Sequence, residues 1–354
     1  MRALIAMSGG VDSSVAAVLM QEAGHECIGA TMHLFHNEDA GIPRAKTCCS
    51  LDDVQDAKLV AAKRGMLHYV FNFGDAFREH VMAPFVEDYA AGRTPSPCIE
   101  CNRWLKFDVL MRRMEELRCD CIVTGHYARS EYDPASGRWL LRTAADTAKD
   151  QTYYLYKMTQ AQLAAVRFPL GGMQKAEVRE TAIRAGLDNA RKRDSQDICF
   201  VPDGDHAAFI ERFAGHPWPH GEIVDTEGHV LGEHQGIIRY TIGQRKGLGI
   251  AAGRPLYVCR IDAAQNRVIV GDDAALWTQD LFADELNMIA VPEIVGEMRV
   301  TAKIRSRHQA APATAWMEDG RLHVRFDEPQ RAVTPGQAVV LYQDDIVIGG
   351  GRIV

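Results

Sequence analysis

The residues Ser8-Gly9-Gly10-Val11-Asp12-Ser13-Ser14 have the composition of a loop that binds phosphate. They follow the apolar run Ala3 to Met7, which predicts a strand, and they open a segment with helical periodicity. Two glycines let backbone amides turn toward an anion, and the start of a helix adds about half a positive charge. The hydroxyls of Ser13 and Ser14 can also donate.

This loop lacks the lysine of a Walker loop and the spacing of a dinucleotide fingerprint. We therefore predict a nucleotide phosphate site of another class, with Asp12 placed to hold Mg²⁺ against the phosphates. The alternative is a tight turn in which Asp12 only caps the helix.

Two cysteine segments also have the residue types for chemistry. Cys98 and Cys101 stand in Thr94 to Asn102, which its prolines predict to be a loop leading into a helix near Asn102. Close to a helix N-terminus, the dipole lowers a thiol pKa from about 8.5 and favours the thiolate that nucleophilic or persulfide chemistry needs. Cys199 follows Asp194-Ser195-Gln196-Asp197-Ile198 at the end of the α/β half. We expect Cys101 and Cys199 to meet across the mouth of the sheet.

A single C-x-x-C is not specific for this chemistry. It is also typical of a zinc half-site, a redox pair or two buried thiols, and Cys199 between Ile198 and Phe200 could belong to the core. Zinc is disfavoured because the sequence has no second C-x-x-C or well-spaced histidine pair. The remaining cysteines are interpreted as structural: Cys27, Cys48, Cys49, Cys119, Cys121 and Cys259.

The elements that must position these residues alternate in the first half of the chain, which predicts an α/β fold with a doubly wound, mostly parallel sheet. The expected strands are Ala3 to Met7, Cys27 to Leu34, His68 to Phe73 and Cys121 to Tyr127. The expected helices are Ser13 to Ala23, Leu51 to Lys63, Asp75 to Tyr89 and Trp104 to Leu117.

After about residue 200, hairpin signals replace helical patterns. Asp225-Thr226-Glu227-Gly228 and Glu318-Asp319-Gly320 separate alternating strands such as Leu322 to Phe326 and Ala338 to Tyr342. We expect a catalytic domain at 1–205, a small central β-rich domain at 206–272 and a C-terminal antiparallel β-barrel at 273–354.

Composition limits the class of protein. The chain has 354 residues, 47% of them hydrophobic and 25% charged, which suits a globular protein of two or three domains. The apolar run at residues 1–7 is too short for a signal or a membrane span, so we expect a cytoplasmic protein with reduced thiols and no membrane segment.

Charge leaves a nucleic-acid partner open. The formal net charge of -7 argues against one, because phosphate binding rewards a basic surface. Two basic clusters could provide such a surface locally or be solvated faces: Arg191-Lys192-Arg193, and Arg299, Lys303, Arg305, Arg307 and His308.

The loop at 8–14 resembles the pyrophosphatase loop of the PP-loop ATPases, an adenine-nucleotide hydrolase-like group that splits ATP into AMP and pyrophosphate. Over nearly the whole chain, further motifs are similar to those of the bacterial tRNA 2-thiouridylases. These motifs are Pro97 with Cys101-Asn102 and Lys106-Phe107, Thr124 to Arg129, Lys149 to Tyr154, Asp194-Ser195 before Cys199, Thr241 to Gly247, and Gly349 to Gly351.

The resemblance implies a tRNA-uridine 2-sulfurtransferase with Cys101 as nucleophile and Cys199 as persulfide carrier. It implies ATP-binding residues at Ala6, Met7, Ser8, Gly9, Gly10, Val11, Asp12, Ser13, Met32 and Gly125. It implies tRNA-binding residues at Ser96, Pro97, Cys98, His126, Lys149, Asp150, Gln151, Arg305, Ser306 and Gln343. From the residues alone, His126 could equally be a polar strand-end residue, and Lys149 to Gln151 an exposed turn.

In the implied reaction, ATP adenylates the 2-carbonyl of a wobble uridine extruded from the anticodon loop. Sulfur from Cys199 replaces the oxygen, directly or as hydrosulfide, and a Cys101–Cys199 disulfide remains for a reductant to open. The resemblance points to tRNAs for Lys, Glu and Gln, and to a sulfur relay protein or cysteine desulfurase as donor.

One position departs from the family pattern. Many relatives carry an acidic residue where this chain has Cys98. Cys98, Cys101 and Cys199 could therefore hold a [4Fe-4S] cluster instead, since soft thiolates are its usual ligands. Other candidate functions are a PP-loop ligase or amidotransferase, which needs no cysteine pair, and an RNA-binding module without catalysis.

Overall fold

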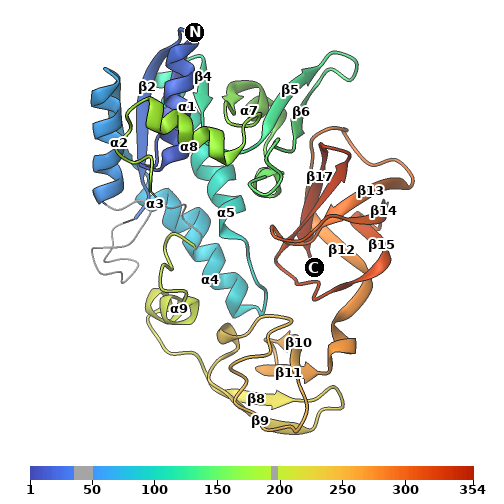
Figure 1. Cartoon of the computed structure of the whole chain (residues 1–354). Helices are drawn as coiled ribbons and strands as arrows, with labels where there is room; N and C mark the ends of the chain where they lie inside the picture. Colours follow the sequence, from blue (N-terminus) through green and yellow to red (C-terminus); the bar gives the residue numbers. More distant parts are fainter. Residues whose placement is uncertain (36–50, 193–197) are drawn as a thin grey trace.

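The computed structural model describes residues 1–35, 51–192 and 198–354, and its first part is a five-stranded parallel sheet (Figure 1). The strand order is β3-β2-β1-β4-β7, which is the order of an open α/β sheet that reverses beside β1. The strands are β1 (Arg2–Ala6), β2 (Glu26–His33), β3 (Leu67–Asn72), β4 (Cys121–Val123) and β7 (Val166–Arg167).

Helices cover both faces of this sheet, as the apolar runs predict. Because successive strand residues point to opposite faces, Ala3 and Ile5 of β1 pack in one cluster, and Leu4 and Ala6 in another. The first cluster contains residues of α1 (Val11–Glu22), α2 (Leu51–Lys63) and α8 (Lys175–Arg184). The second contains the helices between β3 and β4. The doubly wound prediction is confirmed.

The two long helices between β3 and β4 differ from the prediction, because each contains a π-helical stretch with hydrogen bonds five residues apart. The first runs through α3 (Gly74–Phe77), η1 (Arg78–Met82) and α4 (Ala83–Ala90). The second runs through α5 (Pro97–Glu100), η2 (Cys101–Val109) and α6 (Leu110–Glu116).

The predicted loop from Thr94 to Asn102 is therefore too long. The helix begins at Pro97, a position where proline is favourable because its fixed φ suits a helix and its missing N–H has no helical partner there. Cys98 lies in the first turn, whereas Cys101 lies in the second.

The predicted strand from Cys121 to Tyr127 is also too long. Strand β4 ends at Val123, and the chain then passes directly over the first turn of α1. A Cβ on Gly125 would lie 2.6 Å from the backbone nitrogen of Ser13. Only glycine allows this approach of one backbone to another.

A hairpin that the sequence analysis missed follows this loop. Its strands β5 (Arg129–Asp133) and β6 (Arg138–Arg142) extend from the α/β part to the C-terminal barrel (Figure 1). Strand β6 pairs there with β17 through Arg142 and Ile346. The carboxylate of Asp345 accepts hydrogen bonds from Arg129 at 2.8 Å and Arg142 at 2.7 Å.

The second half of the chain is β-rich, as predicted, and both predicted hairpins are present. After α9 (His206–Ala214), a small sheet contains β8 (Gly221–Val224), β9 (Val230–His234), β10 (Tyr257–Asp262) and β11 (Arg267–Gly271). An antiparallel barrel, closed by the pairing of β12 with β17, contains β12 (Trp277–Met288), β13 (Met298–Lys303), β14 (Ala311–Glu318), β15 (Arg321–Arg331), β16 (Ala338–Gln343) and β17 (Ile346–Ile353).

The remaining helices are short. They are η3 (Thr152–Tyr154), α7 (Gln160–Ala165), η4 (Ile237–Arg239) and η5 (Asp273–Leu276). Within the described part of the chain, a helix with the length and apolar character needed to cross a bilayer is absent.

The barrel is docked onto the segment that precedes α5. The backbone N–H of Thr94 donates to the Pro335 carbonyl at 2.9 Å, and the Gln337 amide donates to the Thr94 carbonyl at 2.8 Å. The buried hydroxyl of Tyr153 donates to the Ala338 carbonyl at 3.0 Å. The barrel thus helps to set the position of the helix that carries Cys98 and Cys101.

We predict that Gly125→Ala destabilises the protein, because its methyl group would collide with the backbone of α1. Overpacking of this kind costs about 1–3 kcal/mol, or roughly 2–12 °C in Tm for a domain of this size. Thermal unfolding would measure the change. Gly172→Ala is the matched control, since a Cβ at Gly172 meets nothing within 4 Å, and equal Tm values for the two variants would contradict the prediction.

Candidate active site

The phosphate-binding sequence at 8–14 forms the turn between β1 and α1, as predicted. Gly10 is the N-cap of α1 and has no side-chain cap, so Asp12 does not have the capping role of the alternative interpretation. The hydroxyl of Ser13 donates to the Gly10 carbonyl at 3.1 Å and accepts from the Ser8 N–H at 3.2 Å. The turn is therefore held by its own hydroxyl groups.

Two neighbouring segments fix the loop from outside. Gly9 has a φ of +73°, and a Cβ there would collide with the backbone carbonyl of Asp53 in α2. The buried Asn189 amide donates to the Gly9 carbonyl at 3.0 Å and to the Ser14 hydroxyl at 2.9 Å. Gly9 is thus the residue that lets α2 approach the loop.

Asp12 is engaged by two residues that the sequence analysis did not assign to the site. The ammonium group of Lys175, in the first turn of α8, lies 2.7 and 2.8 Å from the two carboxylate oxygens. The Tyr127 hydroxyl donates to the same carboxylate at 2.9 Å. Lys175 lies 163 residues from Asp12 and left no local signal in the sequence. A cation and a carboxylate together suit the binding of a metal-bound nucleotide.

A cavity of about 240 Å³ opens beside this loop, at the carboxyl ends of β1 and β2. Its described lining includes Met7 and Ser8 from the loop, Met32 from β2, and the three cysteines of interest. The remaining lining residues are Thr31, Leu34, Asp53, Phe77, Val81, Pro97, Lys106, Ile198 and Phe200.

Cys98, Cys101 and Cys199 all line this cavity, although Cys199 is almost a hundred residues from the others in sequence. Cys98 is exposed, and Cys101 and Cys199 are half-buried; all three are thiols in the structure. The expected meeting of the two segments beside the nucleotide loop is confirmed as an arrangement. The chemical roles of these cysteines stay predictions.

The cysteines interpreted as structural have different surroundings. Burial raises the pKa of Cys27 to about 11, and burial likewise raises the pKa values of Cys119, Cys121 and Cys259. These thiols are poor nucleophiles, because the thiolate is the reactive form. Cys48 and Cys49 lie outside the described residues, as does the predicted motif from Asp194 to Asp197.

His126 lies behind the cavity and its ring is satisfied inside the protein. It is 8% exposed, with Nδ1 2.8 Å from the Thr124 hydroxyl and Nε2 3.4 Å from the Lys106 ammonium. Burial, and then the charge of Lys106, hold the pKa of His126 well below its ordinary value of 6.5. A contact with RNA stays a prediction for this residue.

The segment from Lys149 to Gln151 braces the site rather than forming an exposed turn. The Asp150 carboxylate accepts from the Ala144 N–H at 3.1 Å and the Thr152 hydroxyl at 2.7 Å. The side-chain oxygen of Gln151 accepts from the Tyr127 backbone N–H at 2.9 Å. The backbone N–H of Gln151 donates to the Tyr127 carbonyl at 3.0 Å. Asp150 and Gln151 therefore hold the loop that presents Tyr127 to Asp12.

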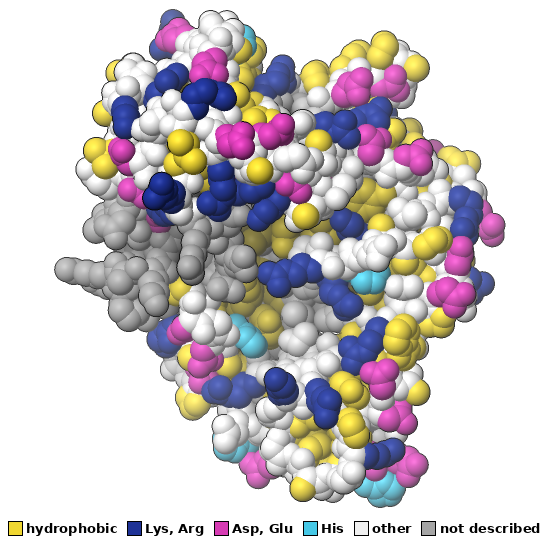
Figure 2. Space-filling model, in the orientation of Figure 1, with side chains coloured by type: hydrophobic (Ala, Val, Ile, Leu, Met, Phe, Trp, Pro, Cys, Tyr) yellow, Lys and Arg dark blue, Asp and Glu magenta, His cyan; other side chains and the backbone are white. Residues whose placement is uncertain are grey.

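The barrel residues of the predicted tRNA set lie at its surface. Arg305 and Gln343 are exposed, and Ser306 is half-exposed and hydrogen-bonded to Tyr154. On the face in Figure 2, Lys and Arg side chains gather toward the middle, between the α/β part, the barrel and the small sheet. A basic surface thus exists locally despite the net charge of -7.

Two members of the basic clusters are ion-paired within the protein. Lys192 forms ion pairs with Asp53 at 2.5 Å and Asp56 at 2.6 Å, so it joins α2 to the segment before Cys199. Arg299 is paired with Asp327 at 2.7 Å. Arg193, in the first cluster, lies outside the described residues.

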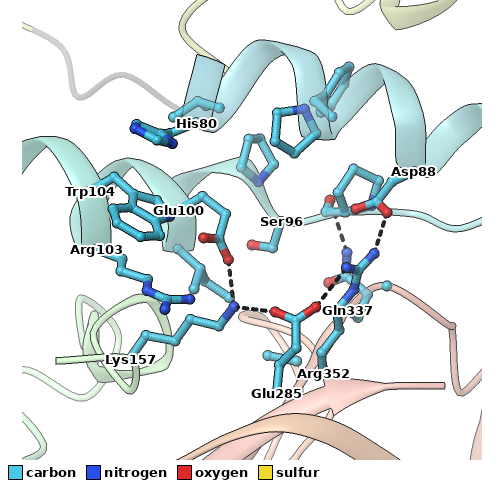
Figure 3. A pocket seen from close by; sticks show the side chains of 18 of the residues that line it. His80, Asp88, Ser96, Glu100, Arg103, Trp104, Lys157, Glu285, Gln337 and Arg352 are labelled. Carbon is cyan, nitrogen blue, oxygen red and sulfur yellow. Dashed lines mark hydrogen bonds and ion pairs between the residues drawn. The ribbon is translucent and has the colours of Figure 1, made fainter. Parts of the chain in front are cut away.

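A second cavity, of about 260 Å³, lies on the other side of the start of α5, between this helix and the barrel (Figure 3). Several of its charged groups are paired with one another: Lys157 lies 2.7 Å from Glu100 and 3.0 Å from Glu285. Arg352 joins Glu285 to the buried Asp88. Glu100 therefore belongs to this second cavity. It does not take the place of the acidic residue that many relatives carry at the position of Cys98.

Comparison with known proteins gives matches over the whole chain. A family model described as the tRNA methyl transferase HUP domain matches residues 1–203, the PRC-barrel domain of the same name matches 207–272, and an aminomethyltransferase beta-barrel domain matches 278–353.

Two relatives illustrate the similarity. The chain is 50% identical over 354 residues to "tRNA-specific 2-thiouridylase MnmA 2" of Caldanaerobacter subterraneus subsp. tengcongensis, which covers 99% of this chain and 97% of the relative. It is 49% identical to "tRNA-specific 2-thiouridylase MnmA" of Lachnoclostridium phytofermentans, covering 100% of this chain and 99% of the relative. A solved 4-thiouridine synthetase–RNA complex with bound ATP is more distant, with 18% identity, a TM-score of 0.40, and coverage of 60% of this chain and 50% of that chain.

The burial of His126 predicts a dependence of stability on pH. Because the folded pKa lies below 6.5, the unfolded chain takes up a proton first as the pH falls, and the folded state loses stability. The loss is about 1.4 kcal/mol per pH unit until the folded pKa is reached. Tm measured between about pH 5 and 8 should fall less steeply in His126→Asn than in the parent protein. The control is the exposed His216→Asn, which should keep the parental slope; an unchanged slope in His126→Asn would rule out this contribution.

Proposed function

The chain belongs to the family of tRNA-specific 2-thiouridylases, and from this premise we propose that it uses ATP to replace the 2-carbonyl oxygen of a tRNA wobble uridine with sulfur. The observation that carries the proposal is the cavity in which the nucleotide loop meets Cys101 and Cys199. We assign residues 1–205 to catalysis, 206–272 to a small central domain and 273–354 to a barrel that contacts tRNA, with the β5–β6 hairpin attached to it. We place the protein in the cytoplasm, where thiols stay reduced.

ATP would bind along the turn from Ala6 to Ser13, with Met32 and Gly125 on either side. The backbone amides and the start of α1 favour the phosphates there. Asp12 suits Mg²⁺, which takes one or two protein carboxylates together with phosphate oxygens and water. Lys175, now paired with Asp12, supplies a positive charge beside the same phosphates. These residues orient the α-phosphate toward the bound uridine, and the charge that develops on pyrophosphate is neutralised there.

The uridine 2-oxygen attacks the α-phosphate, so that pyrophosphate leaves and the oxygen becomes part of an adenylate. A persulfide on Cys199 then attacks carbon 2, the carbon–oxygen bond breaks, and AMP leaves with the oxygen. The Cys101 thiolate attacks Sγ of Cys199, which breaks the bond to the transferred sulfur and leaves 2-thiouridine and a Cys101–Cys199 disulfide. A thiol reductant returns both cysteines to thiols. Release of the sulfur as hydrosulfide before it attacks gives the same products.

The RNA would lie across the basic middle of the face in Figure 2. The wobble base must leave the anticodon stack to reach the cavity, which costs little in a single-stranded loop. We propose contacts from Ser96 to Cys98 at the start of α5, from Lys149 to Gln151 and His126, and from Arg305, Ser306 and Gln343 on the barrel. Acceptors for Lys, Glu and Gln, and a relay protein or cysteine desulfurase as sulfur donor, complete the proposal.

A [4Fe-4S] cluster is the second candidate for the sulfur step, favoured by the presence of three cysteines at one cavity. Cys98, Cys101 and Cys199 offer three soft thiolates, which fits the donor set of such a cluster. When bound, the cluster would supply an iron with an open position for a sulfide. The persulfide route is preferred because its sulfur carrier and nucleophile are cysteines of the chain and it needs no metal cluster.

Rival functions differ in their substrates. A PP-loop ligase or amidotransferase would release pyrophosphate with a small substrate, and an RNA-binding module would release none. The descriptions of the family models mention methyl transfer, which would not produce pyrophosphate from ATP in a tRNA-dependent manner. Release of pyrophosphate only when tRNA is present therefore separates the proposed reaction from a ligase or amidotransferase, from an RNA-binding module and from a methyl transferase.

We predict that Cys101→Ser and Cys199→Ser each abolish 2-thiouridine formation, with a loss of roughly a hundredfold or more. The variants are incubated with a persulfide donor, ATP and tRNA, and mass analysis of the wobble nucleosides measures the 2-thiouridine formed. Both variants should still release pyrophosphate with tRNA, because adenylation needs neither thiol. Cys259→Ser, in the small sheet, is the matched control and should remain active. Near-normal thiolation by Cys199→Ser would exclude the persulfide route.

We predict that protein purified without oxygen is colourless, contains little iron and is active. Iron analysis and the visible spectrum measure this directly. A brown protein with about four iron atoms per chain would favour the cluster instead. In that case Cys98→Ser should lose iron together with activity, whereas Cys259→Ser should retain both.

A further inference from the structure

Lys106 is the one basic side chain among the described residues that line the cavity of the three cysteines. The same lining contains one acidic side chain, Asp53, whose carboxylate lies 2.5 Å from the Lys192 ammonium outside the described lining. Lys106 thus places a positive side chain at a cavity whose other polar groups include three thiols. Anionic sulfur is the species that such a charge stabilises.

The π-helical stretch η2 explains how Lys106 reaches this cavity. Lys106 follows Cys101 by five residues, and in an α-helix residues five apart point about 140° away from each other. In η2 (Cys101–Val109) the hydrogen bonds join residues five apart, so the helix is wider and these two positions lie on the same side of it. Both side chains therefore face the same cavity.

His126 holds the Lys106 ammonium from behind. The distance from Lys106 Nζ to His126 Nε2 is 3.4 Å, and the ring nitrogen Nδ1 lies 2.8 Å from the Thr124 hydroxyl. A neutral ring with its proton on Nδ1 donates to Thr124 and accepts from the lysine. The low pKa of His126, caused by burial and then by the charge of Lys106, agrees with this arrangement. An ammonium group has three N–H donors, so two more can point into the cavity.

The place of Cys101 in the helix limits what the helix dipole contributes to a thiolate there. The effect of the helix dipole is confined to the first turn, and Cys101 begins the second turn of the helix that starts at Pro97. The dipole acts more strongly on Cys98 than on the predicted nucleophile. A nearby ammonium is an independent means of lowering a thiol pKa.

We propose that Lys106 is a positioning residue for sulfur transfer, whose ammonium group, held by His126, keeps Cys101 as a thiolate and attracts the persulfide anion on Cys199. The inference rests on the proposed function and adds a residue to it. Cys101 gives its proton to solvent, and its electron pair forms the bond to Cys199 Sγ. The negative charge moves to the departing sulfur within the field of the same ammonium group.

The test measures how fast iodoacetamide alkylates Cys101 at different pH, read by mass spectrometry in a Cys98→Ser background so that one thiol reacts in that peptide. Lys106→Met should raise the apparent pKa of Cys101 by about one unit and slow alkylation near neutral pH about tenfold. Lys106→Arg keeps the charge and should retain the parental profile. Lys58→Met, on the exposed surface of α2, is the matched control and should change nothing.

An unchanged profile in Lys106→Met, with the circular dichroism spectrum of the folded protein, would overturn the proposal. If Lys106→Met does not fold, Lys106→Gln compared with Lys106→Arg makes the same measurement. The assay uses neither ATP nor tRNA, so its outcome is independent of thiolation. A shifted profile in a protein that does not thiolate tRNA would contradict the proposed function but not the electrostatic role of Lys106.

Discussion

Backbone packs directly against backbone at the start of α1, and the site depends on this contact. The loop after β4 crosses α1 at Gly125, and α2 approaches the nucleotide loop at Gly9. Any larger side chain at either position would separate these segments. The separation would move Tyr127 away from Asp12 and Asp53 away from the cavity. The same two contacts therefore position both the phosphate-binding groups and one wall of the cavity that the three cysteines line.

The sequence was sufficient for the features that depend on neighbouring residues or on a general rule of sheets. The turn from Ser8 to Ser14 is local, because its glycines, its strand and its helix are all adjacent. The meeting of Cys101 and Cys199 follows from a rule of open α/β sheets, in which sites form at the carboxyl ends of strands. The alternation of apolar and polar residues also predicted the C-terminal barrel, because a period of two residues is visible in short segments.

The features that were missed depend on contacts between distant residues or on irregular backbone. The pair of Lys175 and Asp12 leaves no pattern, since any lysine could make it. Strand β6 of the missed hairpin β5–β6 also pairs with β17 of the barrel, a contact between distant residues that the local sequence does not indicate. The prolines near Cys98 were interpreted as loop residues, although Pro97 occupies the first helical position where proline is well tolerated. A π-helical stretch shifts the helical period, so Lys106 did not fall on the face of Cys101 in an α-helical reading.

The attachment of the barrel has a mechanical consequence. Besides the covalent connection through η5, the barrel is joined to the α/β part by β6 pairing with β17 and by the hydrogen bonds of Thr94. Two ion pairs, Lys157 with Glu285 and Asp88 with Arg352, also join the two parts. A chain break between the small sheet and the barrel would leave these joints intact. A load on the barrel surface would be transmitted through Thr94 to the first turn of α5, one helical turn before Cys101. A force on the barrel would therefore act on the helix that carries Cys98 and Cys101, and not only on the chain connection.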